Sequence, residues 1–252
     1  MSNLSFPSDT CHVIVLDFPW MRDKDPRTPL GHASLLATLA QNQNLVSRSF
    51  IRPINGENRF SIEQAWNEIA EMIEETNGGN VDIAIGAYVW AEEVIQVLPP
   101  KIRDALSSGR IILGGPQISY LSSGLESLYP ECDIFVRGYG EMALLAICSS
   151  HEKQIIQGVH YAGDPDENKQ TVIDLDLLPS PFLSGIVSLE GNPFIRWESQ
   201  RGCPFSCSFC QHKEAGAKLR KKEFCEGRIF REIDMFCENK VSAIAVLDPI
   251  FN

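Results

Sequence analysis

The 252-residue sequence lacks several features that would assign it to common protein classes. It has no run of about 20 apolar residues, so no membrane span is expected. Met1–Thr10 has no basic stretch followed by an apolar one, so no signal peptide is expected. Basic residues are few: the chain has 22 Lys and Arg against 33 Asp and Glu, so its formal net charge is −11. This negative charge disfavours binding to nucleic acid or to an anionic membrane. A cytoplasmic protein is predicted.

A disulfide framework is also not expected, because disulfides are rare in a reducing compartment. Five of the eight cysteines are scattered, and we interpret them as small buried apolar residues: Cys11, Cys132, Cys148, Cys225 and Cys237. The other three, Cys203, Cys207 and Cys210, are clustered with the spacing C-x3-C-x2-C directly after a predicted strand. Hydrophobic residues make up 44% of the chain, which is enough for a buried core.

Apolar strands alternate with helical patterns from residue 12 to about 150. The expected strands are His12–Asp17, Leu45–Ile51, Val81–Val89, Arg110–Leu113 and Asp133–Arg137. The expected helices are Leu30–Gln43, Ser61–Glu75 with Ser61 as its cap, Ala91–Leu106 broken by Pro99 and Pro100, one from about Ser119, and Glu141–Ser150. The predicted fold class is therefore α/β, with a doubly wound, parallel five-stranded sheet of flavodoxin or Rossmann type. Its ligand site is expected at the carboxyl ends of the strands.

The regular alternation stops after residue 150. Residues 151–193 are interpreted as a hairpin, with arms at Gly158–Ala162 and Thr171–Asp174, followed by a proline-rich linker. A second strand–helix pattern occupies residues 194–252, with a helix at Glu223–Glu238 and a strand at Val241–Leu247. The predicted domains are therefore 1–150, 151–193 and 194–252. The last strand has an unpaired edge, which predicts aggregation.

The clustered cysteines predict an iron–sulfur centre, since thiolates on one short loop are the usual ligands of such clusters. Three cysteines can hold three corners of a [4Fe–4S] cluster and leave one iron open. A Cys3His zinc site that includes His212 stays an alternative, as does a chance group of buried cysteines.

Residues 198–212, ESQRGCPFSCSFCQH, closely resemble the signature loop of the radical S-adenosylmethionine (SAM) enzymes. The resemblance implies that Cys203, Cys207 and Cys210 ligate a [4Fe–4S] cluster whose fourth iron binds SAM. It implies cleavage of SAM to methionine and a 5′-deoxyadenosyl radical, with an electron donor such as flavodoxin or ferredoxin. Phe209 matches the aromatic residue that packs near the adenine. Residues 194–252 match the start of the family's partial (βα)6 barrel.

The N-terminal sheet resembles the cobalamin-binding domain that precedes the radical domain in one branch of that superfamily. The match rests on Pro29-Leu30-Gly31, Gly86–Trp90, Gly114-Gly115-Pro116, Arg137–Glu141 and the LPSPF linker. The implied cobalamin contacts are Pro29, Gly31, Tyr88, Val89, Trp90, Gly114, Gly115, Pro116, Gly138, Gly140 and Glu141. Trp20, Trp90 and Trp197 are candidates for the pocket wall, with core packing as an equal alternative.

One departure from cobalamin proteins concerns the cobalt ligand. The D-x-H-x-x-G motif that supplies a histidine to cobalt in many of them is absent. His32 follows Gly31, but no aspartate stands two residues before it. His32 is therefore predicted to be a helix-surface residue.

The leading hypothesis for function is a cobalamin-dependent radical SAM methyltransferase acting on an unactivated carbon or phosphorus centre of a small molecule or peptide. Radical cyclisation or rearrangement is the alternative within this class. A catalytically inactive cobalamin-binding and cluster-binding module is a second hypothesis, and a zinc-stabilised interaction protein is a third. Later barrel strands and a substrate-binding region have no counterpart in the sequence, so it is interpreted as a fragment of a longer enzyme. No catalytic residue beyond the cluster ligands is identified.

Overall fold

The computed structural model describes residues 11–25, 28–56, 60–76, 79–106, 108–205, 207 and 222–249. The strands are β1 Cys11–Asp17, β2 Leu45–Ile51, β3 Val81–Gly86, β4 Ile111–Gly114, β5 Ile134–Val136, β6 Val159–Tyr161, β7 Phe194–Trp197, β8 Gln200–Arg201, β9 Lys222–Glu223 and β10 Ala243–Val246. The helices are α1 Leu30–Leu39, α2 Ile62–Glu74, α3 Glu92–Ala105, α4 Pro116–Tyr120, α5 Leu125–Leu128, α6 Glu141–Cys148 and α7 Glu226–Glu238, with 3-10 turns η1 Val89–Ala91 and η2 Leu175–Leu177.

The main sheet has six strands in the order β2-β1-β3-β4-β5-β6. Strands β1 to β5 are parallel, and β6 is antiparallel to β5. The order 2-1-3-4-5 is that of flavodoxin-like doubly wound sheets, so the predicted α/β class is confirmed. The predicted count of five strands is wrong, because Val159–Tyr161, assigned to a hairpin, pairs with β5 and extends the sheet. Thr171, in the second arm of the predicted hairpin, forms an isolated β-bridge with Gly138.

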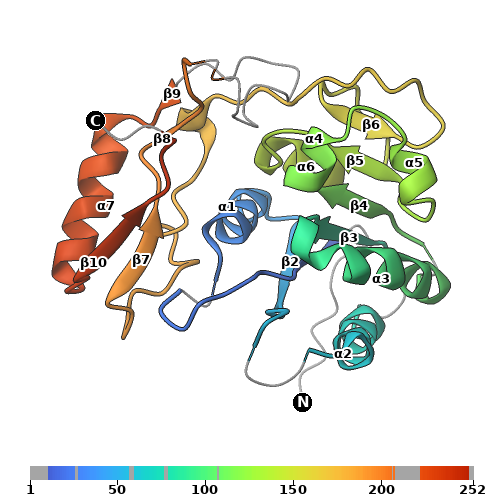
Figure 1. Ribbon diagram of the computed structural model, residues 1–252, viewed down its shortest axis with the longest axis horizontal. Coiled ribbons are helices and arrows are strands. Elements are labelled where there is room, and N and C mark those ends of the chain that lie inside the picture. The colour runs from blue at the N-terminus through green and yellow to red at the C-terminus, as the bar shows by residue number, and fades with distance from the viewer. Residues whose placement is uncertain are drawn as a thin grey trace.

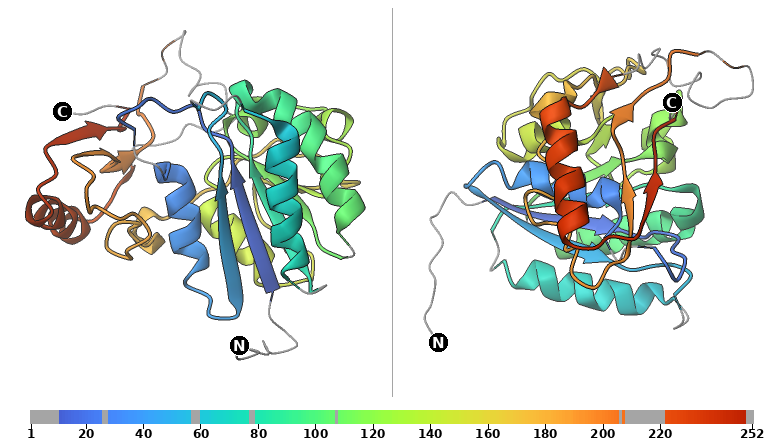
Figure 2. Two further views of the ribbon diagram at one scale, coloured as in Figure 1. Left: turned by 90° about the horizontal axis from the view of Figure 1, so that it is seen from below. Right: turned by 90° about the vertical axis from the view of Figure 1, so that its left-hand side faces the viewer.

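Helices cover both faces of this sheet. Figure 1 shows α1 on the side of the sheet that faces β7 and β10, and Figure 2 shows α2 and α3 on the opposite face. Alternate strand residues point to opposite faces. The α2 and α3 face buries Ile14, Leu16, Ile83, Ile85, Ile111 and Leu113, together with Ile69 and Leu98 of the helices. The α1 and α6 face buries Val13, Val15, Ala84, Ile112 and Val136, together with Leu36 and Leu144.

Helices α2 and α3 each bear on one prediction from the sequence. Ser61 caps α2 as predicted, because its side chain accepts a hydrogen bond from the Gln64 backbone N–H. Helix α3 runs without interruption through Pro99 and Pro100, so the predicted break is wrong. Proline's fixed φ is compatible with a helix, and burial of the apolar face around Ile95 and Leu98 outweighs the lost hydrogen bonds.

A second unit packs against the outer side of α1. Strands β7 and β10 are parallel, and α7 covers them (Figure 1). Ala33 of α1 packs into one apolar cluster with Phe182, Trp197 and Phe236. Helix α1 is therefore enclosed between the main sheet and this unit. Among the described strands, β10 pairs with β7 alone, and Ile244 on it is 41% exposed.

The described helices include none that is long and apolar enough to cross a membrane.

Candidate functional site

A cavity of about 270 Å³ lies at the carboxyl edge of the main sheet. The ends of β1, β3, β4 and β5, the first turns of α1 and α6, and Arg201 of β8 form its wall. The strand order reverses between β1 and β3, and ligands bind at this point in doubly wound sheets. A second cavity of about 290 Å³ shares Gly115, Gly138, Tyr139 and Arg201 with the first. The wall therefore combines residues of the N-terminal sheet with the strand that leads into the cysteine loop.

Glycines shape the cavity wall in two ways. Gly115 has a φ of 109°, and a Cβ there would lie 2.8 Å from the Ala87 carbonyl oxygen. Gly138 has a φ of 82°, and a Cβ there would lie 2.8 Å from Thr171 Oγ1. A side chain at either position would be strained. At Gly31, by contrast, a Cβ would meet no atom within 4 Å, so this glycine leaves open space on the wall.

A buried polar group forms part of the wall where β1 ends. Asp17 and His32 both line the cavity and are 3% and 2% exposed. Asp17 Oδ2 lies 3.7 Å from His32 Nδ1, and His32 Nε2 lies 2.8 Å from Ser49 Oγ. Burial raises the pKa of Asp17 to about 7, against a hydrogen bond from the Phe18 backbone that lowers it. Burial lowers the pKa of His32 to about 4, so both side chains are neutral near pH 6.

Arg201 connects the cavity to the cysteine loop, two residues before Cys203. Its guanidinium lies 2.7 Å from Glu141 Oε1 and 2.6 Å from Glu198 Oε1, and it stacks on the Tyr139 ring at 5.1 Å. Burial by itself lowers the pKa of Arg201, but the two carboxylates outweigh it and raise that pKa above its ordinary value. Ser34 of α1 donates to the same Glu141 oxygen at 3.1 Å. This ion-pair group joins α1, α6 and β8.

The chain just before the cysteines is held by the strand that follows them. Asp248, after β10, accepts hydrogen bonds from the backbone N–H groups of Ser199 at 2.8 Å and Gln200 at 3.2 Å. Cys203 is half-buried, Cys207 is exposed, and both are free thiols. Two accessible thiols on one loop have the donor chemistry that an iron–sulfur cluster requires.

Two further predicted members of the cluster site, Cys210 and Phe209, and the alternative zinc ligand His212 lie outside the described residues. Within residues 11–249, less the gaps given above, no group of three His, Cys, Asp or Glu side chains is arranged to hold a metal. The three-cysteine site stays a prediction.

The structure brings most of the predicted cobalamin contacts together. Gly31, Tyr88, Gly114, Gly115, Gly138, Gly140 and Glu141 line the first cavity, and Pro116 lines the second. Pro29, Val89 and Trp90 line neither cavity, and the last two are 70% and 45% exposed. The loops after three strands and the start of α1 thus meet at one edge, and their contact with a ligand stays a prediction.

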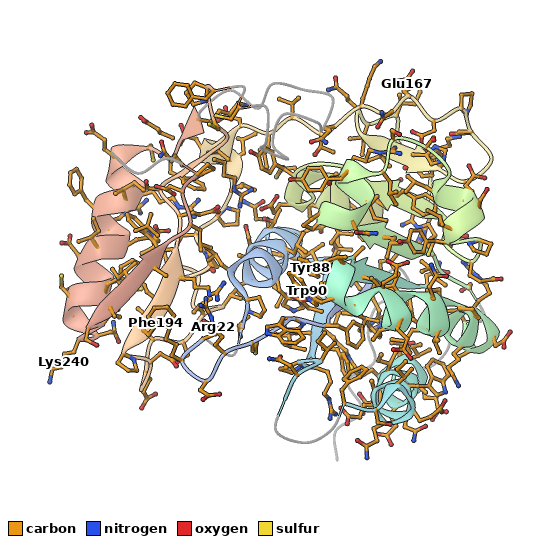
Figure 3. All side chains as sticks on the ribbon, viewed as in Figure 1. Arg22, Tyr88, Trp90, Glu167, Phe194 and Lys240 are labelled. Atoms are coloured by element: carbon orange, nitrogen blue, oxygen red, sulfur yellow. The ribbon has the colours of Figure 1, made fainter. Side chains whose placement is uncertain are left out.

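Tryptophans were candidates for the pocket wall, and the structure separates them. Trp90 stacks on Tyr88 with ring centroids 4.8 Å apart, and Figure 3 shows the two side by side near the start of α3. Trp197 packs against Phe236 and donates to Glu232 Oε2 at 2.6 Å, so the core-packing alternative is right for it. Trp20 is 58% exposed.

Sequence reasoning placed His32 incorrectly and missed Asp17, Tyr139 and Arg201. His32 is not on a helix surface, because α1 is enclosed on both sides and His32 faces Ser49 of β2. A signal for Asp17 exists in the sequence: it is an acidic residue at the end of an apolar strand, at the edge where ligands bind. Arg201 gives no comparable signal, because its contacts come from residues far away in the sequence.

Comparison with known proteins supplies the remaining evidence. The cobalamin-dependent radical SAM methyltransferase TokK of Streptomyces tokunonensis is 27% identical over 189 residues, which cover 67% of this chain and 27% of TokK. The 2-(S-pantetheinyl)-carbapenam-3-carboxylate methyltransferase of Streptantibioticus cattleyicolor is 25% identical over 206 residues, 73% of this chain and 30% of that protein. The chain resembles the cobalamin-dependent radical SAM methyltransferases. This finding confirms the resemblance that the sequence motifs indicate.

A third relative extends the match along the chain. An uncharacterized methyltransferase of Pyrococcus horikoshii is 22% identical over 237 residues, 88% of this chain and 49% of that protein. No protein-family model matches the chain. The chain spans between 27% and 49% of the length of these three relatives.

Proposed function

We propose that this chain is the cobalamin-binding domain and the start of the radical domain of a cobalamin-dependent radical SAM methyltransferase. One observation carries the proposal: the glycine-lined cavity is bounded by Arg201, two residues before Cys203. A methyl donor in this cavity would lie beside the loop that would hold the radical source. The resemblance to TokK, whose name states cobalamin dependence and radical SAM, supports the same assignment.

The residues present fit both cofactors. The open space at Gly31, the positive-φ turns that Gly115 and Gly138 permit, and the orphan oxygen of Asp17 suit a large flat ligand with amide groups at its edge. Cys203 and Cys207 would ligate the cluster together with Cys210. When bound, the cluster supplies the electron that cleaves SAM, and cobalamin supplies the methyl group.

In this proposal the protein's own groups position and shield the two cofactors. Glu141 and Glu198 hold Arg201 at the boundary between the cavity and the cysteine loop. Asp248 holds the strand end from which the loop leaves. The apolar wall formed by residues such as Ile112 and Val136 excludes water from the cavity. The proposed substrate is a small molecule or a peptide. The proposed electron donor is a protein such as flavodoxin or ferredoxin.

Iron binding tests the cluster. The protein is purified without oxygen and reconstituted with iron and sulfide, and iron is quantified while the absorption near 400 nm is recorded. About four irons per chain are expected, since a [4Fe–4S] cluster fits a three-cysteine loop. Changing Cys203, Cys207 and Cys210 to Ala should remove the iron.

Cys11, Cys132 and Cys148 are buried as predicted, but the predicted burial of Cys225 and Cys237 is wrong, because both are exposed. Changing Cys225 and Cys237 to Ala is therefore the matched control, since both are exposed thiols outside the loop and should leave the iron content unchanged. Stoichiometric zinc without iron would contradict the proposal and favour the zinc-stabilised alternative.

Cobalamin binding and turnover separate the remaining alternatives. Reconstitution with hydroxocobalamin should give a bound cobalamin spectrum. Cobalamin binding without formation of 5′-deoxyadenosine under reducing conditions would favour the inactive binding module. 5′-Deoxyadenosine formed without methyl transfer, when a substrate is found, would favour radical cyclisation or rearrangement.

A further inference from the structure

We propose that Asp17 determines which ligand edge the cavity accepts: its buried carboxyl Oδ1 donates a hydrogen bond to a carbonyl oxygen of the ligand, such as an amide oxygen at the edge of a corrin. This inference rests on the proposed function. It assigns a chemical role to a residue that carries no sequence motif.

The first observation is an orphan atom on the cavity wall. Asp17 lines the cavity, and its side chain is 4% exposed. Among the described residues, its buried Oδ1 has no hydrogen-bond partner. A buried polar atom without a partner destabilises a fold, so such atoms are rare and call for an explanation. A bound ligand would provide the partner that the protein does not.

The second observation places this oxygen at the ligand edge of the sheet. A Cβ built on Gly86 would lie 3.8 Å from Asp17 Oδ1, and Gly86 itself lines the cavity at the end of β3. The oxygen therefore lies at the carboxyl ends of the neighbouring strands β1 and β3, where the strand order reverses. The same Cβ would lie 3.2 Å from Tyr88 Cε2, so the Tyr88 ring also lies next to this part of the wall.

The third observation concerns charge around the carboxyl group. The groups that face it are His32 from α1, Tyr88 after β3, and, across the cavity, Glu141 of α6 and Arg201 of β8. Of the described side chains in this wall, Arg201 is the one permanent cation, and it is held by Glu141 and Glu198. His32 is neutral near pH 6, because burial lowers its pKa to about 4.

These surroundings leave a carboxylate at Asp17 without a compensating positive charge. Burial accordingly raises the pKa of Asp17 to about 7. A neutral carboxyl group carries a proton that it can donate, so the matching ligand group is an acceptor. Ionised Asp17 would instead repel a carbonyl oxygen.

Two substitutions separate the roles of charge, shape and hydrogen bonding. Asp17→Asn is neutral at every pH and keeps a donor of similar size. Asp17→Leu has a similar volume and no polar atom. Asp133→Asn is the control, because Asp133 is a carboxylate that precedes β5, at the opposite edge of the sheet. Dissociation constants for cyanocobalamin are measured for the four proteins at pH 6 and pH 8.5, with melting temperatures of the unliganded proteins.

The expected pattern is specific to a donor role. Wild-type protein should bind cyanocobalamin about tenfold more weakly at pH 8.5 than at pH 6, because ionised Asp17 no longer donates its hydrogen bond. Asp17→Asn should bind within about threefold of wild type at pH 6 and show no pH dependence. Asp17→Leu should bind about tenfold more weakly at pH 6 yet melt at a higher temperature than wild type, because the orphan carboxyl group is gone. Asp133→Asn should follow wild type in binding.

Other results would overturn the inference. If Asp17→Leu binds as tightly as wild type, Asp17 does not contact the ligand. If the Asn and Leu variants weaken binding equally, or if wild-type affinity is independent of pH, Asp17 is not a donor. If wild-type protein binds no cobalamin at either pH, the proposed function is wrong and this inference fails with it.

Discussion

Asp17 and His32 are buried side by side, and their burial gives the stability of the fold two opposite dependences on pH. The folded-state pKa of Asp17 is about 7, above its ordinary value of 3.8, so its contribution to stability is present at low pH and is lost as pH rises from about 4 to 7. The folded-state pKa of His32 is about 4, below its ordinary 6.5, so its penalty is present at low pH and disappears as pH rises through the same range. In the wild type the two effects largely cancel between pH 4 and 6.5.

This cancellation predicts the stability of single variants. Asp17→Asn should have a free energy of unfolding that rises by about 3 kcal/mol from pH 4 to 6.5, because the His32 effect is no longer opposed. His32→Gln should show the opposite slope, falling by a similar amount. Urea unfolding at several pH values measures both, with wild type as the reference. Parallel curves for the three proteins would show that the two side chains are not buried as described.

At the level of single residues, the sequence predicts only part of the candidate site. Gly115 and Gly138 are visible in the sequence because they lie directly after apolar strands, and Gly31 is visible because it belongs to the motif Pro29-Leu30-Gly31. The Asp17–His32–Ser49 group is not, because its members come from β1, α1 and β2 and meet only when the helix packs on the sheet. Its chemistry also depends on burial, which the enclosed position of α1 creates.

Elements were predicted best where they lie in the centre of the main sheet. Strands β1, β3, β4 and β5 are mostly apolar runs between polar turns, and burial on both faces produces such runs directly. Strand β6 has three residues and one buried side chain, so it carries almost no periodic signal. Its place at the sheet edge follows from pairing with β5, which is a long-range contact that local patterns do not record.

Helix α3 yields a prediction at the element scale. Pro100 is exposed within a continuous helix, where its missing N–H removes a backbone hydrogen bond without compensation from burial. Pro100→Ala should raise the free energy of unfolding by about 1 kcal/mol. Pro116→Ala is the control, since Pro116 starts α4, where no intrahelical bond is lost, and it should give no gain. Equal effects of the two changes on urea midpoints would contradict this explanation.

Contacts across α1 join the two units of the molecule, and among the described residues two ion pairs also connect them. Arg201 pairs with Glu141 beside the cavity, and Arg196 of β7 pairs with Asp25 at 2.8 Å on the loop after β1. At this second contact Lys24 Nζ lies 5.1 Å from the centre of the Phe194 ring, which Figure 3 labels. The division of the chain into three domains stays a prediction.

These two pairs provide a matched test of how the units communicate. Arg201→Met should leave Glu141 buried without its positively charged partner and lower the free energy of unfolding by about 3 kcal/mol. It should also weaken cobalamin binding and reduce iron incorporation, because Arg201 borders both proposed sites. Arg196→Met should lower the free energy of unfolding but leave cobalamin binding and iron incorporation unchanged. Calorimetry, cobalamin titration and iron analysis on both variants check this; unaltered cofactor binding in Arg201→Met would show that its role is only structural.

The hydrogen bonds from Ser199 and Gln200 to Asp248 have a consequence for the order of assembly. Asp248 is made 49 residues after Ser199, so at about 5 to 20 residues per second the ribosome needs several seconds to supply it. During that interval the main sheet can already be folded and Arg201 can already pair with Glu141 and Glu198, but the stem of the cysteine loop still lacks its hydrogen bonds to Asp248. We therefore expect the stem of the cysteine loop to be fixed in place only after the cavity has formed.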